Sequence, residues 1–136
     1  MTLKVSELSV GDTYSECLVE DLKRTQIVQY AGSSGDYNPL HTDEVFTTKV
    51  AGYPSVFAHG MLTMGMTGRM VTNYVGDGRL TKYGVRFTNQ VWPGDTLNST
   101  ATVESLENNV VRLAIETKNQ DGATVLSGYA EARVDD

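Results

Sequence analysis

The second half of the chain alternates apolar and polar residues, which is typical of strands with one buried face. The apolar positions of the clearest segments are Tyr83, Val85, Phe87, Val91, Val111, Leu113 and Ile115. We predict a four-stranded antiparallel meander over about 82–91, 97–106, 111–116 and 123–134, extended by an earlier strand near 14–19. Pro93 and Gly94 stand in the order that a type II turn prefers, and residues 119–122 have the pattern of a hairpin connection.

Two main helices are predicted before this sheet, over about 25–33 and 60–75. A shorter helix is expected after Thr42, with Thr42 as its cap. Apolar residues, including most of the methionines, surround the second main helix on nearly every side, so we expect it to be buried. Gly65 and Gly68 leave room for a close neighbour. The fold class is therefore α+β, a sheet wrapped on one buried helix, whose open edges favour dimerisation.

Length and composition narrow the classes of function. The 136 residues suit a single domain, 1–136, and 40% apolar and 21% charged residues are typical of a globular protein. A net charge of −6 without a basic run argues against nucleic-acid binding. Cys17 is the single cysteine and His41 and His59 are the only histidines, so neither a disulfide framework nor a zinc site is expected.

Targeting and membrane segments are not apparent in the sequence. The N-terminus has an early acid, Glu7, and no apolar core of the length found in signal peptides. No stretch approaches the roughly 20 apolar residues that a bilayer-spanning helix requires. We therefore expect a cytoplasmic protein without a membrane partner.

A stretch with the sequence Ser-Gly-Asp-Tyr-Asn-Pro-Leu-His ends at His41. Gly35 suits a left-handed helix cap, and Pro39 keeps the preceding residue out of the helical region, so this stretch is expected to be a loop. Asn38 can stabilise the loop by bonding to nearby backbone. Asp36 and His41 then meet only where the loop folds back, and as a pair they suit acid–base catalysis. Spacing alone supports a capped structural turn equally well.

A second candidate segment, Ala-His-Gly-Met, leads into the second main helix. Free amides and the positive dipole end at a helix start stabilise an oxygen that gains negative charge, and Gly60 lets such an oxygen approach. His59 is expected to cap the helix or support the loop rather than to act as a base. No Asp or Glu occurs between Glu44 and Asp77, so Asp36 is the candidate carboxylate near this helix.

These two segments, with a Val-Arg-Phe strand at 85–87 and a Gly-Asp turn at 94–95, resemble the MaoC-like (R)-specific enoyl-CoA hydratases (hydratase 2). The order of these motifs along the chain is also similar to that in mycobacterial hydroxyacyl-thioester dehydratase subunits. The resemblance covers about 5–134. It implies a hot-dog fold, in which a curved antiparallel sheet wraps one long central helix, and a dimer with its active site at the subunit interface.

The resemblance also implies the chemistry. Water adds reversibly to a trans-2-enoyl thioester to give a (3R)-3-hydroxyacyl thioester, with Asp36 and His41 activating the water and returning a proton to C2. The Gly60 amide would hold the thioester carbonyl. No metal or redox cofactor is expected, because coenzyme A is part of the substrate. Residues expected to bind substrate or support the catalytic pair are Ser34, Asn38, His59 and Met61.

The rest of the substrate site is less specific in sequence. A CoA or acyl-carrier thioester carries phosphate, so a basic patch is expected on this acidic chain. The candidates for that patch are Arg69, Arg79, Lys82 and Arg86. The candidates for the floor of the acyl pocket are Phe57, Met61, Met64 and the 53–57 segment. Acyl length, reaction direction and pathway stay open.

Other functions of the same fold remain as alternatives. A hot-dog acyl-CoA thioesterase often carries a carboxylate on or near the central helix, where this chain has none. A bacterial carrier-protein dehydratase would use a His and a Glu on a motif that is absent here. A non-enzymatic acyl-binding subunit would not need Asp36 and His41. We expect a homodimer, with a heterodimer, in which this chain is the catalytic hot-dog subunit, as the alternative.

Overall fold

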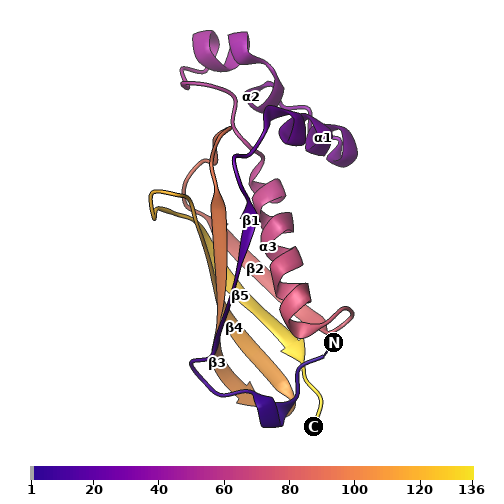
Figure 1. Ribbon diagram of the computed structural model, residues 1–136. Helices are drawn as coiled ribbons and strands as arrows, with labels where there is room; N and C mark the ends of the chain where they lie inside the picture. Colours follow the sequence, from indigo (N-terminus) through magenta and orange to yellow (C-terminus); the bar gives the residue numbers. More distant parts are fainter. Residues whose placement is uncertain (1) are drawn as a thin grey trace.

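The computed structural model describes residues 2–136. One antiparallel sheet packs against one long helix, α3 (Gly60–Val75), which lies along a single face of the sheet (Figure 1). The strands are β1 (Thr13–Val19), β2 (Leu80–Phe87), β3 (Leu97–Glu107), β4 (Val110–Lys118) and β5 (Thr124–Arg133). The predicted α+β class, with a sheet against one central helix, is confirmed.

The strand order is β1-β3-β4-β5-β2. The prediction of a meander is therefore confirmed for β3, β4 and β5 but is wrong for β2, which pairs with β5 at the edge opposite β1. The predicted strand 82–91 ends at Phe87. The Thr88 amide still donates to Val125 O at 3.0 Å, but beyond it the chain leaves the sheet, and Val91 accepts a hydrogen bond from Ala58 at 2.8 Å. The turn at Gly94 is as predicted, with φ +94°, and it lies in this crossover rather than in a hairpin.

Helix α3 is buried on one side only. The residues buried on it are Thr63, Thr67, Met70, Val71 and Val75. Met61, by contrast, is 56% exposed, so the prediction of a helix buried all round is wrong for a single chain. The expected close approach is confirmed at Gly68, where an added Cβ would lie 3.2 Å from the Tyr83 ring, whereas nothing lies within 4 Å at Gly65.

The shorter helical segments gather beyond the N-terminal end of α3 (Figure 1). They are α1 (Arg24–Ser34), α2 (Pro39–Thr42) and η2 (Phe46–Val50), while η1 (Val5–Glu7) lies near the chain start. Thr42 ends α2 instead of capping the next turn. Asp43 takes that place, because its Oδ1 accepts the Phe46 amide at 3.1 Å. Within residues 2–136, no helix has both the length and the apolar character to cross a membrane.

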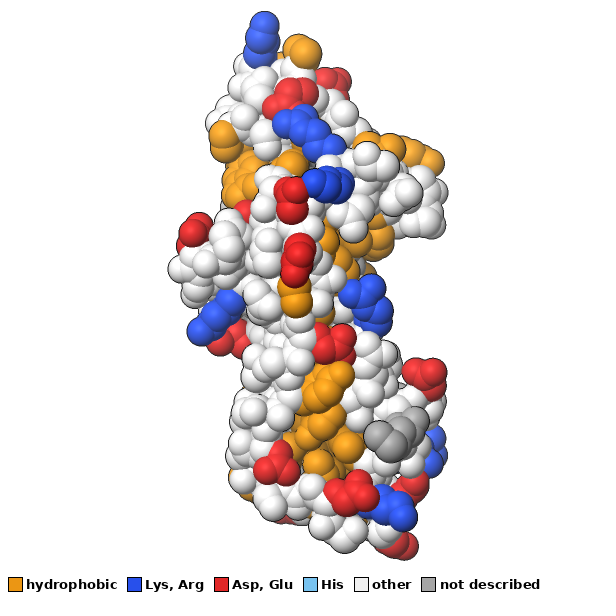
Figure 2. All heavy atoms as spheres, in the orientation of Figure 1, with side chains coloured by type: hydrophobic (Ala, Val, Ile, Leu, Met, Phe, Trp, Pro, Cys, Tyr) orange, Lys and Arg blue, Asp and Glu red, His pale blue; other side chains and the backbone are white. Residues whose placement is uncertain are grey.

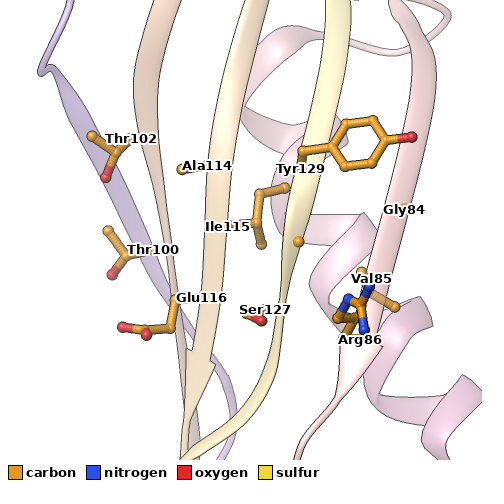
Figure 3. A pocket seen from close by; sticks show the side chains of 11 residues that line it. Gly84, Val85, Arg86, Thr100, Thr102, Ala114, Ile115, Glu116, Ser127 and Tyr129 are labelled. Carbon is orange, nitrogen blue, oxygen red and sulfur yellow. The ribbon is translucent and has the colours of Figure 1, made fainter.

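The sheet carries a groove of about 740 Å³ whose walls do not include Asp36, His41 or Gly60. Its walls come from β2, β3, β4 and β5 and include Arg86, Thr100, Glu116 and Tyr129 (Figure 3). Helix α3 lies behind the sheet in that view, so the groove opens on the other face of the sheet. Small side chains hollow this face.

Candidate active site

The loop between α1 and α2 is folded by its own side chains. Gly35 ends α1 with φ +76°, as predicted for a left-handed cap. The hydroxyl of Ser34 accepts the Asp36 amide at 3.2 Å, and Asp36 Oδ1 accepts the Asn38 amide at 3.2 Å. Asn38 Oδ1 in turn accepts the Leu40 amide at 3.0 Å and caps α2. The predicted bonding of Asn38 to nearby backbone is therefore confirmed.

The segment before α3 holds this loop at three points. The Phe57 amide donates to Leu40 O at 3.2 Å, and His41 Nδ1 lies 2.7 Å from Phe57 O. His59 Nε2 lies 3.0 Å from Asp36 O. Because a carbonyl only accepts, the proton of a neutral His41 sits on Nδ1 and that of a neutral His59 on Nε2. His41 Nε2 is therefore unprotonated and its lone pair is free to accept a proton.

Asp36, His41 and His59 form one cluster, in which one side-chain oxygen or nitrogen of each residue lies within 4.8 Å of the others. The two imidazoles stack with centroids 3.9 Å apart and planes inclined by 24°. His59 is buried, His41 is half-buried and the Asp36 carboxylate is exposed. The structure thus brings together the predicted pair and places the second histidine behind it, supporting the loop without a side-chain cap on α3.

The surroundings of His41 favour its neutral form. Burial lowers the pKa of His41, and charge on the neighbouring His59 lowers it further. The hydrogen bond to Phe57 O and the Asp36 carboxylate act in the opposite direction without reversing the shift. His41 is therefore unprotonated near neutral pH, with Nε2 available as a base beside a carboxylate.

The same cluster is better arranged for proton transfer than for a metal ion. His41 Nδ1 and His59 Nε2 are already hydrogen-bonded to carbonyls, so His41 Nε2 and His59 Nδ1 are the nitrogens whose lone pairs could bind a metal ion. Imidazole lone pairs lie in the ring plane, and the planes of stacked rings converge only far from the rings. Two such lone pairs do not meet at one ion about 2.0 Å from each nitrogen.

The start of α3 offers the second functional element. Among the described residues, the Gly60 and Met61 amides have no hydrogen-bond partner. A Cβ on Gly60 would lie 3.2 Å from the Phe87 ring, so glycine suits this crowded position. Gly60 borders a pocket of about 310 Å³ that Phe57 and Thr63 also line, whereas Met61 and Met64 are not part of its walls.

The four basic candidates fall into two groups. Arg69 donates to Leu18 O at 3.0 Å, and Arg79 makes a two-pronged ion pair with Asp135. Lys82 and Arg86 are exposed on β2 and, among residues 2–136, make no ion pair or side-chain hydrogen bond. Sequence reasoning missed the carbonyl of Phe57, because a main-chain acceptor leaves no signal in residue type. It also missed Tyr30, whose ring meets His59 edge-on at 4.8 Å.

Comparison with known proteins shows which family the chain is similar to. Residues 6–125 match the family described as "MaoC like domain". The peroxisomal enoyl-CoA hydratase 2 of Arabidopsis thaliana is 38% identical over 104 residues, which are 74% of this chain and 32% of that protein. The 3-hydroxyacyl-thioester dehydratase Y of Mycobacterium tuberculosis is 44% identical over 69 residues, 48% of this chain and 24% of that protein. The chain thus spans a third or less of the length of these two relatives.

A solved structure matches over nearly the whole chain. The R-hydratase PhaJ1 of Pseudomonas aeruginosa, in its unliganded form, superposes with a TM-score of 0.85 and 28% identity, covering 99% of this chain and 87% of that one. The (R)-hydratase of A. caviae gives the same TM-score at 22% identity, which supports the fold alone. The family match, the relatives and the shared hot-dog architecture lead to one conclusion: this chain belongs to the MaoC-like dehydratase family.

Proposed function

We propose that this chain catalyses the reversible hydration of trans-2-enoyl thioesters to (3R)-3-hydroxyacyl thioesters. The observation that carries the proposal is the pairing of the Asp36 carboxylate with a His41 ring whose Nδ1 donates to Phe57 O. That hydrogen bond leaves Nε2 unprotonated and directed away from Phe57. The named activities of the enoyl-CoA hydratase 2 and R-hydratase relatives support the same reaction.

The residues divide the reaction between them. Asp36 and His41 hold a water and accept its proton as the oxygen attacks C3 of the enoyl group. Negative charge then moves to the thioester oxygen, where the Gly60 amide and the positive end of α3 stabilise it. A proton returns from the pair to C2, so water is added overall and nothing is oxidised or reduced. Dehydration is the same path in reverse, and coenzyme A or a carrier group enters only as part of the substrate.

A homodimer is part of the proposal. Strand β2 is a sheet edge, and Tyr37, Met61 and Phe87 are 66%, 56% and 50% exposed. Apolar side chains also reach the surface in several patches on the face seen in Figure 2. A second copy would pair the edge and cover apolar surface next to Gly60. Sedimentation of the purified chain tests this point, since a stable, active homodimer excludes an obligate different partner.

The reaction is tested by absorbance of the enoyl-thioester band with crotonyl-CoA and with a longer enoyl-CoA. We expect the band to disappear and chiral analysis to give the (3R) product. Release of free thiol instead would identify a thioesterase. Loss of the band with the (3S) product would contradict the proposed placement of water and proton donor.

A further inference from the structure

The hydroxyl of Thr63 is buried and has no hydrogen-bond partner among the described residues. Buried hydroxyls are nearly always paired, because an unpaired one loses its water without compensation. Thr67, one helical turn further along the same side of α3, shows the usual arrangement. Its hydroxyl lies 2.8 Å from Thr117 Oγ1, which itself donates to Ser99 Oγ at 2.9 Å. The unpaired hydroxyl of Thr63 therefore points to a group that is supplied by a ligand.

Thr63 lies where an acyl chain would pass. It lines the same 310 Å³ pocket as Gly60 and follows it by three residues, which corresponds to about 4.5 Å along the helix axis. A thioester carbonyl bound at the Gly60 amide therefore places the first carbons of its acyl chain beside Thr63. The Thr63 hydroxyl is itself buried in the rotamer of this structure. Because threonine in a helix adopts two χ1 rotamers, we expect the second rotamer to present the hydroxyl to the pocket.

The size and lining of the pocket limit what it accepts. Its volume is close to the lower end of the range of ligand pockets, roughly 300–1,000 Å³. Phe57, Val91 and Val125 supply apolar wall, while Thr88, Asn89 and Gln90 make one side polar. A long hydrocarbon chain would leave the Thr63 hydroxyl unpaired, whereas a short chain with an oxygen atom would pair it.

We infer that this pocket is the acyl subsite, that it takes a short acyl chain carrying a hydroxyl or carbonyl oxygen beyond C3, and that Thr63 binds this oxygen. The inference rests on the proposed function, because that function places the thioester carbonyl at Gly60. Thr63 is then a specificity residue rather than a member of the acid–base pair.

The test compares two substrates that differ by one hydroxyl, hex-2-enoyl-CoA and 5-hydroxyhex-2-enoyl-CoA. The wild-type protein is expected to favour the hydroxylated substrate in kcat/KM by roughly 10- to 100-fold. Thr63→Val, which keeps the shape of the side chain, should abolish this preference, and Thr63→Ser should retain it. Thr67→Val is the matched control, since it removes a paired hydroxyl from the same helix and should lower the Tm without changing the preference. Equal use of both substrates by the wild type, or an unchanged ratio in Thr63→Val, would overturn the inference.

Binding of the saturated analogues separates this inference from the proposed function. Calorimetry with hexanoyl-CoA and 5-hydroxyhexanoyl-CoA involves no turnover. A preference for the hydroxylated analogue that disappears in Thr63→Val supports the acyl subsite whether or not the enoyl substrates are hydrated. If neither enoyl substrate is hydrated, the proposed reaction alone is refuted. Equal binding of the two analogues by a protein that hydrates enoyl-CoA would refute the subsite alone.

Discussion

Replacing His59 tests how the proposed catalytic pair, Asp36 and His41, is held in place. In His59→Ala the hydrogen bond to Asp36 O is lost, together with the ring that stacks on His41 at 3.9 Å. A typical hydrogen bond contributes about 1 kcal/mol and an aromatic pair about 0.5–1.5 kcal/mol beyond its buried area. If the whole of this interaction energy serves to position Asp36 and His41, its loss lowers kcat/KM by roughly 10- to 100-fold, at about 1.4 kcal/mol for each factor of ten.

The pH profile gives a second readout. His59→Ala opens the site to water and removes a group that, when charged, disfavours charge on His41, and both changes raise the pKa of His41. Because the proposed reaction uses neutral His41 as a base, the acid limb of the kcat/KM profile should move to higher pH. His59→Gln is the control, since its amide can still donate to Asp36 O and should retain most of the rate.

The assay is hydration of crotonyl-CoA across pH 5 to 8 for the three proteins, with circular dichroism to show that each is folded. An acid limb that stays in place or moves to lower pH in His59→Ala would refute the assigned surroundings of His41. A loss larger than that of His41→Ala would show that His59 takes part in the chemistry itself.

Three further predictions concern the pair and the backbone. Asp36→Asn and His41→Ala should each lower kcat by about 10²–10⁴ with unchanged circular dichroism, and near-full activity in either would refute the assigned pair. Gly128→Ala should destabilise the fold by about 1–3 kcal/mol or more in thermal unfolding, because its Cβ would lie 2.1 Å from Gly84 O. Gly32→Ala in α1 should stabilise the protein by about 0.5–1 kcal/mol, since nothing lies within 4 Å of the added methyl, and a lower Tm would show an unrecognised contact.

Local pattern predicted most of the elements because each depends on neighbouring residues. The helix over 60–75 and the strands near 97–106 and 111–116 agree with the structure to within a few residues. The position of β2 was not predictable in this way, since alternation specifies which face of a strand is buried and not which strand it pairs with. Exposure of one side of α3 was also missed, because apolar residues around a helix do not show whether their partner belongs to the same chain.

The candidate site was predictable in its residue types but not in its connections. The motif that contains Asp36 and His41 predicted the pair, and the structure brings the two side chains close together, although their sequence spacing alone does not. They meet because the main chain of Phe57 binds Leu40 and His41 while the side chain of His59 binds the carbonyl of Asp36. A main-chain atom, which any residue can supply, leaves no signal in residue type. The stacking of His59 on His41 also has no sequence signal, because it depends on how two separate segments of the chain cross.

The hydrogen bonds of the 57–59 segment also link the two halves of the proposed site. The Phe57 carbonyl holds the proposed base His41, the His59 side chain holds the backbone of Asp36, and Gly60 follows directly with the amide proposed to bind the thioester oxygen. Within four consecutive residues the chain therefore contacts both Asp36 and His41 and begins the helix whose dipole is proposed to stabilise the developing charge. The loop cannot shift relative to Gly60 without breaking one of these hydrogen bonds. The spacing between the Asp36–His41 pair and the Gly60 amide is thus set by covalent geometry and a few short contacts.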